Sequence, residues 1–192
     1  MDRSLWKQQI LPFTILLGLL AGAALLGDVL LHRFDLVWVG RYLGIPGTLL
    51  IVASLAYSLR KRKMVQSGNL RTYLTAHEIA AWLGSLMVLI HAGIHFNDIL
   101  PWLATVAMGI NVISGMVGKM LLDRSRRQVQ GQRDHYELRG LPKHEVEQAV
   151  FWDAVMVDTM ARWRKVHIPI FVAFAVLGLG HIVSIFLFWG WR

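Results

Sequence analysis

The chain has 192 residues, of which 55% are hydrophobic and 17% charged, and its formal net charge is +8. Its mean hydropathy of +0.48 is too high for an ordinary water-soluble domain, and the apolar residues stand in long blocks. Because the sequence has no cysteine, disulfides, thiolate-held iron–sulfur clusters, covalent c-type haem and cysteine nucleophiles are excluded in this chain.

Five stretches are long and apolar enough to be membrane-spanning helices, each of which needs about 20 mostly apolar residues. They are residues 11–31, 42–59, 76–95, 99–122 and 167–189. The sequence therefore predicts an all-α integral membrane protein in which residues 1–192 form one bundle of about five transmembrane helices. No small-residue cleavage site follows the first stretch, so we expect a span there rather than a removable signal peptide.

The first two spans carry features of helix packing. Residues 11–31 contain GLLAG, in which Gly18 and Gly22 form a small-xxx-small pair that favours close approach of another helix. Pro46 lies in the first turns of the second span, where it should begin or bend the helix rather than break it. The polar residues at the outer end of the first span are interpreted as an interfacial belt: Asp28, His32, Arg33 and Asp35.

The third span is apolar but contains His77, His91 and His95. A histidine in hydrocarbon needs a bonding partner, because an unpaired polar group there costs free energy. The fourth span contains three glycines that leave room for a neighbouring helix or a bulky ligand: Gly109, Gly115 and Gly118.

Residues 123–166 form the only sizeable polar region of the sequence. We expect a loop followed by an amphipathic helix over 145–165, which lies on the cytoplasmic face of the membrane. Docking of a soluble partner is a rival role for this helix. Three tryptophans near the last span are expected to anchor it at the membrane interfaces: Trp163, Trp189 and Trp191.

The basic residues predict the orientation in the membrane. Lysine and arginine concentrate in residues 60–71 and 119–165, whereas the opposite side holds only Arg33, Arg41 and Arg192. By the positive-inside rule, the N-terminus is cytoplasmic and the C-terminus is outside. The charge thus reflects topology rather than nucleic-acid binding, and we expect a bacterial or archaeal cytoplasmic membrane.

Four histidines form two pairs with the same spacing. His77 and His91 are 14 residues apart in the third span, and His167 and His181 are 14 apart in the fifth. Fourteen residues make four helical turns less about 40° and rise about 21 Å, so each pair shares one face. Both spans run in the same direction, which brings His77 level with His167 and His91 level with His181. The spacing predicts two stacked b-type haems, each held by one histidine from each span.

His95 is the alternative outer ligand, because it lies 18 residues after His77, or five whole turns. The matching position in the fifth span is Ile185, so the spacing favours His91. His95 and Asp98 are instead candidates for a quinone site at the outer face, or His95 for a contact to a haem propionate. Glu78 and Tyr73 are the corresponding inner candidates for quinone chemistry. Each could equally be an interfacial polar residue.

Other residues are candidates for cofactor contacts. Gly84 and Gly178 could let a flat porphyrin approach the helix backbone, with ordinary helix packing as the alternative. Arg71, Arg164 and Lys165 could pair with propionates at the inner haem. Their alternative role is that of a positively charged cytoplasmic flank.

The patterns H-x13-H at His77 and His91 and WRKVHIP…GLGH around His167 and His181 resemble those of membrane cytochromes b. The chain is similar over about 42–189 to the ferric-reductase-like transmembrane superfamily, which includes the NADPH oxidases. It is equally similar to the five-helix diheme cytochrome b subunits of respiratory enzymes. The first group commonly has six helices, and its reductases carry FAD- and NADPH-binding domains. This sequence has no G-x-G-x-x-G motif, so the resemblance implies a separate protein or a quinol as electron donor.

The sequence thus predicts a diheme electron-transfer subunit of an oxidoreductase complex rather than a complete enzyme. Expected partners are membrane lipid, a redox subunit at 123–166 and another redox protein outside. One alternative is a catalytic membrane subunit that reacts with quinol or quinone. A histidine-lined metal or proton transporter is less favoured, because the spans are apolar between the histidines.

Overall fold

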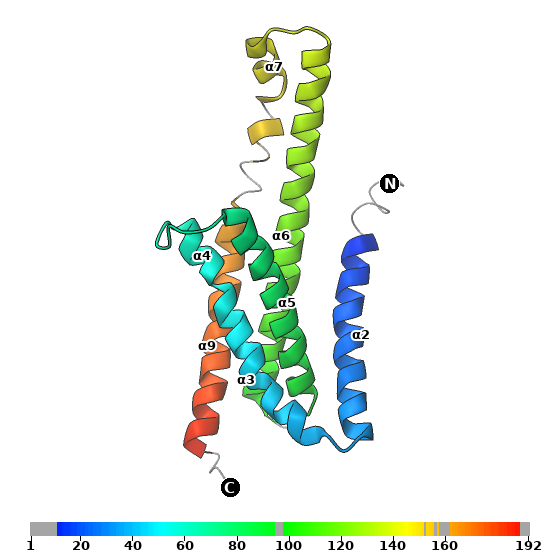
Figure 1. The fold of residues 1–192 in the computed structure, drawn as a ribbon, viewed down its shortest axis with the longest axis vertical. Helices are drawn as coiled ribbons and strands as arrows, with labels where there is room; N and C mark the ends of the chain where they lie inside the picture. The colour runs from blue at the N-terminus through cyan, green and yellow to red at the C-terminus, as the bar shows by residue number, and fades with distance from the viewer. Residues whose placement is uncertain (1–10, 95–97, 152, 156, 158–161, 189–192) are drawn as a thin grey trace.

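The computed structural model describes residues 11–94, 98–151, 153–155, 157 and 162–188, and every regular element among them is a helix (Figure 1). The helices are α2 (Leu11–Arg33), α3 (Val37–Ser54), α4 (Ala56–Lys61), α5 (Leu70–Ile94), α6 (Ile99–Leu138), α7 (Lys143–Ala149) and α9 (Arg164–Phe188). The predicted all-α class is therefore confirmed for these residues.

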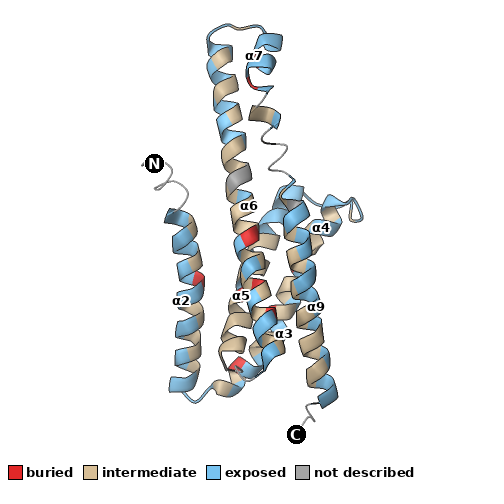
Figure 2. Ribbon diagram, turned by 180° about the vertical axis from the view of Figure 1, so that it is seen from behind, coloured by how far each residue is buried: buried red, intermediate tan, exposed pale blue. Residues whose placement is uncertain are grey.

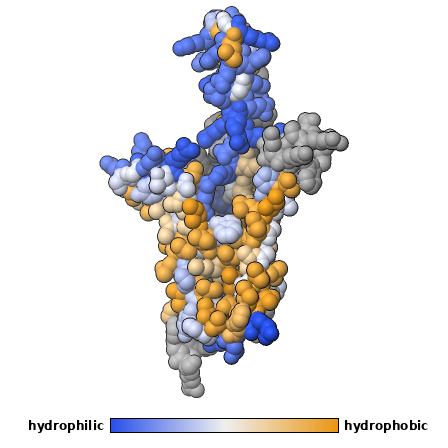
Figure 3. All heavy atoms as spheres, turned by 45° about the vertical axis from the view of Figure 1, so that its right-hand side comes forward, coloured by the Kyte–Doolittle hydropathy of each residue, from blue (hydrophilic) through white to orange (hydrophobic). Residues whose placement is uncertain are grey.

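Five helical segments are long and apolar enough to cross a membrane. Their bounds are Leu11–Arg33, Val37–Lys61, Leu70–Gly93, Ile99–Leu138 and Lys165–Phe188. All five predicted spans are confirmed as helices, and several extend beyond the apolar stretch because polar residues continue the same helix. Figure 3 shows the apolar side chains gathered around the body of the bundle, below a hydrophilic projection.

The helices associate mainly as two pairs, α3 with α5 and α6 with α9. At the α3–α5 crossing, a Cβ added to Gly84 would lie 2.8 Å from the carbonyl oxygen of Gly47. A Cβ added to Gly47 would lie 3.0 Å from the carbonyl oxygen of Gly84. These two glycines therefore let the backbones of α3 and α5 touch, as small residues commonly do between membrane helices.

The α6–α9 pair uses small residues in the same way. The indole Nε1 of Trp163 donates to the carbonyl oxygen of Ser114 over 2.8 Å. The open sides of Gly115 and Gly118 face His167 and Trp163, so these glycines make room for a neighbouring helix. Nothing lies within 4 Å of a Cβ added to Gly109. Trp163 thus joins two helices, while Trp189 and Trp191 lie outside the described residues.

The expected loop after residue 122 is wrong. Helix α6 runs without a break for 40 residues, or about 60 Å, which is twice the roughly 30 Å hydrocarbon core. The arginines and glutamines in its second half are good helix formers, and no proline occurs between Pro101, in the first turn of α6, and Pro142. Figure 1 shows this half of α6 projecting from the bundle with α7 folded back beside it.

The expected amphipathic helix over 145–165 is described only in part, because residues 152, 156 and 158–161 lie outside the described residues. Val146 and Val150 are only 3% and 1% exposed, and α7 packs against the projecting half of α6. Their apolar surface is therefore buried within a helical hairpin, and α7 lies at the end distant from the spans. We call this hairpin, residues 123–150, the arm.

Few side chains of the spans are buried within the chain (Figure 2). The apolar residues buried there are Leu20, Ala104 and Met108. No residue in the apolar window of α9 is buried by the rest of the described chain. So large an apolar surface is typical of helices surrounded by lipid or by other membrane-embedded groups.

The close helix approach predicted at Gly18 and Gly22 is not formed by the described residues, since nothing lies within 4 Å of a Cβ added to either glycine. Helix α2 instead approaches α5 through Gly27, where an added Cβ would lie 2.7 Å from Cδ1 of Ile90. Contact therefore occurs near the C-terminal end of α2, one or two turns beyond the predicted glycine pair.

Candidate functional site

His91 on α5 is oriented by the backbone of α3. Its Nδ1 lies 3.1 Å from the carbonyl oxygen of Gly40. A carbonyl oxygen can only accept a hydrogen bond, so Nδ1 carries the hydrogen and the neutral ring has its lone pair on Nε2. The ring passes close to Gly44, where an added Cβ would lie 2.9 Å from Cδ2 of His91. Glycine at that position makes room for the imidazole.

His77 is oriented in the same manner four turns away. Its Nδ1 donates to the carbonyl oxygen of Ser54 over 2.9 Å. Ser54 is the last residue of α3, where carbonyl groups have lost their partners within the helix. The ring of Tyr57 lies beside the imidazole, with the ring centres 5.5 Å apart. Both histidines of α5 are thus held by α3 in the tautomer that presents Nε2 to a metal.

The two histidines of α9 lie level with those of α5. The ring centres of His91 and His181 are 6.4 Å apart, with their planes inclined by 55°. Nδ1 of His167 lies 3.3 Å from the hydroxyl oxygen of Ser114 on α6. The structure therefore brings His91 and His181 together, which is one of the two pairs that the 14-residue spacings predict.

The separation of the outer pair fits two imidazoles that share one metal ion. With metal–nitrogen bonds of about 2.0–2.1 Å and about 1.1 Å from ring nitrogen to ring centre, the centres would lie roughly 6.3 Å apart. The distance between His91 and His181 is 6.4 Å. In addition, α5 packs mainly on α3 and α9 on α6, so these two helices meet through side chains rather than through a tight backbone contact.

The donor set also bears on which cofactor fits. Among the described residues, no group of three or more metal-ligating side chains surrounds a common point. A bare zinc ion usually takes three or four protein ligands, whereas haem iron already has four porphyrin nitrogens and needs only two axial ligands. An opposed pair of imidazoles, such as His91 and His181, is thus a suitable donor set for haem.

The other predicted cofactor residues occupy different surroundings. Gly84 faces α3, so its contacts are those of helix packing rather than of clearance for a porphyrin. A Cβ added to Gly178 would have only Cε2 of Phe174 within 4 Å. The predicted propionate partners all lie at the beginnings of the two histidine-bearing helices: Arg71 on α5, and Arg164 and Lys165 on α9. A propionate role for these three residues stays a prediction.

The two groups of quinone candidates have different surroundings, and the pairing of His95 with Asp98 stays a prediction. His95 lies outside the described residues, and Asp98 is an exposed residue that precedes α6. On the inner side, Glu78 accepts a hydrogen bond from Nζ of Lys119 on α6 over 2.5 Å. The ring of Tyr73 instead packs toward Gly68, where an added Cβ would lie 2.9 Å from Cε2.

The partners of the histidines were beyond sequence reasoning. Gly40 and Ser54 act through backbone carbonyls, which every residue carries, so no sequence signal marks them. The sequence gives only a weak indication that Ser114 lies at a helix contact: it directly precedes Gly115 and lies one turn from Gly118 on the same helix. That cluster of small residues indicates a close helix contact but does not say which side chain fills it.

No protein-family model, no curated protein and no solved structure matches this chain. The resemblance to membrane cytochromes b therefore rests on the histidine pattern and the helix order.

Proposed function

We propose that this chain is a diheme b-type cytochrome subunit that carries electrons across a membrane. In this proposal His77 and His167 hold the inner haem, and His91 and His181 hold the outer haem. The observation that carries it is the opposed pair of His91 and His181, with ring centres 6.4 Å apart and Nδ1 of His91 bonded to Gly40.

The hydrogen bonds to α3 give the histidines of α5 their proposed role. A donated Nδ1 hydrogen fixes the ring orientation and makes Nε2 a better ligand. Haem, when bound, supplies a one-electron carrier at each level. The two levels are about 21 Å apart along the helix axis, which is most of the roughly 30 Å hydrocarbon core. The apolar residues between them exclude water from the path.

We infer that the chain acts with other redox subunits in a bacterial or archaeal cytoplasmic membrane. The arm is the surface proposed for a cytoplasmic partner, because it projects beyond the spans from the side rich in lysine and arginine. A second redox protein or a quinone would exchange electrons at the opposite face. The chain is then an electron-transfer subunit rather than a complete enzyme.

The proposal is tested by haem content and spectra of the purified chain. We expect two haems b per polypeptide by pyridine haemochrome, with low-spin bis-histidine bands in the reduced spectrum. His77→Ala and His181→Ala should each reduce the content to about one. His144→Ala is the matched control, because its side chain is 72% exposed on the arm. Well-folded wild-type protein without haem would overturn the proposal.

A further inference from the structure

Two charged side chains interrupt the apolar spans on either side of the α5–α6 connection. Glu78 is the one residue among aspartate, glutamate, lysine and arginine in the predicted stretch 76–95, and Lys119 is the one in 99–122. A charged group within a span costs free energy unless it is paired. The structure pairs these two with each other, since Nζ of Lys119 donates to Oε2 of Glu78 over 2.5 Å.

This ion pair joins the two helix pairs of the bundle. Helix α5 packs mainly on α3 and α6 mainly on α9, and the two pairs meet mainly where α5 contacts α6. Glu78 is on α5 and Lys119 is on α6. Helix α9 is in turn tied to α6 by the hydrogen bond from Trp163 to the carbonyl oxygen of Ser114. The position of α9 relative to α5 therefore depends on how α6 is held against α5.

The ion pair lies far from the covalent connection between the same two helices. Helix α5 ends at Ile94 and α6 begins at Ile99, so the chain itself keeps the helices together there. Glu78 precedes Ile94 by 16 residues, or about 24 Å, and Lys119 follows Ile99 by 20 residues, or about 30 Å. The connection and the ion pair thus restrain α5 and α6 at opposite ends of the spans.

The ion pair also lies beside the proposed inner ligands. Glu78 directly follows His77 on α5. Lys119 lies one turn after Gly115 on α6, and a Cβ added to Gly115 would lie 3.4 Å from Cε1 of His167. The imidazole of His167 is therefore next to the part of α6 that the ion pair holds.

The surroundings strengthen the attraction between the two charges. An ion pair exposed to water contributes little, because water screens it and the side chains lose freedom. Lipid has a much lower dielectric constant, so there the attraction is larger and an unpaired charge costs more. Breaking this pair should therefore let α5 and α6 separate at the end where the chain does not connect them.

We propose that Glu78 and Lys119 are positioning residues whose ion pair sets the separation of α5 from α6, and thereby that of His77 from His167. The inference rests on the proposed function, in which these two histidines hold the inner haem. Neither charged residue ligates the haem. His91 lies about 20 Å farther along α5, so the outer site should not depend on this ion pair.

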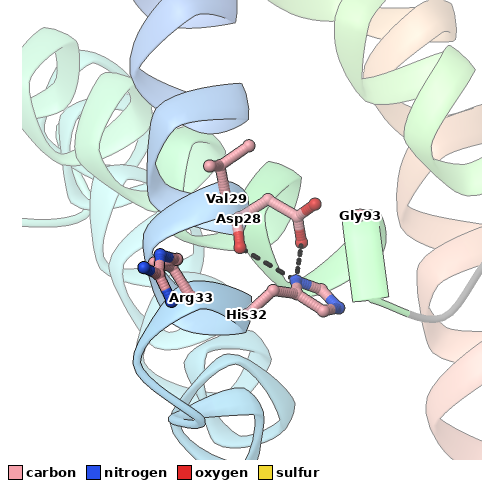
Figure 4. A pocket seen from close by; sticks show the side chains of 5 residues that line it. All are labelled: Asp28, Val29, His32, Arg33 and Gly93. Carbon is pink, nitrogen blue, oxygen red and sulfur yellow. Dashed lines mark hydrogen bonds and ion pairs between the residues drawn. The ribbon is translucent and has the colours of Figure 1, made fainter.

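The acid–base pair near the C-terminal end of α2 is a matched control (Figure 4). Asp28 and His32 lie one turn apart on the same helix, and Nδ1 of His32 is 3.5 Å from Oδ1 and 2.9 Å from the carbonyl oxygen of Asp28. The side chain of His32 is 53% exposed and that of Lys119 is 52% exposed. His32→Met thus removes the partner of an acid without removing a bond between helices.

Double electron–electron resonance between two spin labels measures the helix separation in the full chain in phosphatidylcholine nanodiscs. The labels are placed at Leu70→Cys on α5 and Arg126→Cys on α6, which are exposed positions in a chain without other cysteines. Lys119→Met and Glu78→Gln should each lengthen or broaden the distance distribution. The charge-swapped chain, Glu78→Lys with Lys119→Glu, should restore it, and His32→Met should leave it unchanged.

Haem retention then tests the effect on the inner site. In the His181→Ala chain, which keeps the inner pair, Lys119→Met should speed haem loss about tenfold or more. In the His77→Ala chain, which keeps the outer pair, the same change should alter the rate less than twofold. The charge swap with Glu78 should restore inner haem retention, which a general loss of packing would not allow.

Unchanged label distances in folded Lys119→Met and Glu78→Gln would overturn the proposal, as would equal acceleration of haem loss at both sites. Failure of the charge swap to restore the distance would do the same. If the single variants do not fold, recovery of a folded chain with the wild-type distance on charge swapping supports the proposal, and no recovery overturns it. A wild-type chain without haem would end the proposed function, and the label distances alone would then decide the role of the ion pair.

Discussion

His77 and His91 each donate Nδ1–H to a carbonyl oxygen of α3, and this bond determines which nitrogen a metal can reach. On α9, His167 meets the hydroxyl group of Ser114 in place of a carbonyl. The spacing of the histidines predicts that they share a face, because it depends only on helix periodicity. Their partners could not be predicted, since they depend on which backbone groups a neighbouring helix leaves unpaired.

Ser114→Ala tests the orienting role at the residue scale. Loss of the hydroxyl group should leave His167 able to rotate, and the affinity for the inner haem should fall about 10–100-fold. The hydrogen bond from Trp163 should survive, because it goes to the backbone oxygen of residue 114. The measurement is the rate and extent of haem loss during dilution in detergent.

Ser85→Ala is the matched control, because Ser85 is another buried serine and is 2% exposed on α5. Its haem content should equal that of wild type. Equal haem retention by Ser114→Ala and wild type would show that this hydroxyl group does not orient a ligand.

At the scale of elements, glycines set how closely the helices approach. Gly47 and Gly84 allow backbone contact between α3 and α5, and this contact brings the carbonyl groups of Gly40 and Ser54 within reach of the histidines. The sequence analysis left Gly84 open between haem clearance and helix packing. The contacts of Gly84 are those of packing, which a periodicity argument could not decide because it does not identify the neighbouring helix.

Gly84→Ala should destabilise the bundle by about 1–3 kcal/mol, as overpacking of a tight core does. The added methyl group would lie 2.8 Å from the backbone oxygen of Gly47, so α3 and α5 must separate. Thermal unfolding in detergent, followed by circular dichroism, measures the loss. Gly18→Ala is the control, since nothing lies within 4 Å of the added Cβ, and its unfolding should change by no more than about 0.5 kcal/mol.

At the scale of the whole molecule, the arm and most of the basic residues lie on one side of the bundle. Helix α2 begins near the arm end, whereas α9 ends at the opposite end (Figure 1). Five spans place the beginning of the first helix and the end of the last helix at opposite ends of the bundle. The positive-inside rule then predicts that the arm is cytoplasmic and that the α2–α3 turn is outside.

Cysteine labelling tests that topology, because the chain has no cysteine of its own. Arg139→Cys places a thiol at the tip of the arm, and Phe34→Cys places one in the α2–α3 turn, where Phe34 is 67% exposed. A membrane-impermeant maleimide should label Phe34→Cys in intact spheroplasts and Arg139→Cys only in inverted vesicles. The reverse pattern would show the opposite orientation.

The sequence by itself determined the number and position of the apolar helices, and it predicted the levels of the four histidines. Both depend on local properties, since a bilayer requires long apolar segments with internal hydrogen bonds and a helix repeats every 3.6 residues or so. The tertiary structure alone decided that α3 pairs with α5 and α6 with α9, that residues 123–150 form an arm, and which groups bond to His77, His91 and His167. Lipid is as apolar as the helix surfaces, so hydrophobicity does not determine which helices become neighbours. Close contacts between small residues such as Gly47 and Gly84 determine it instead.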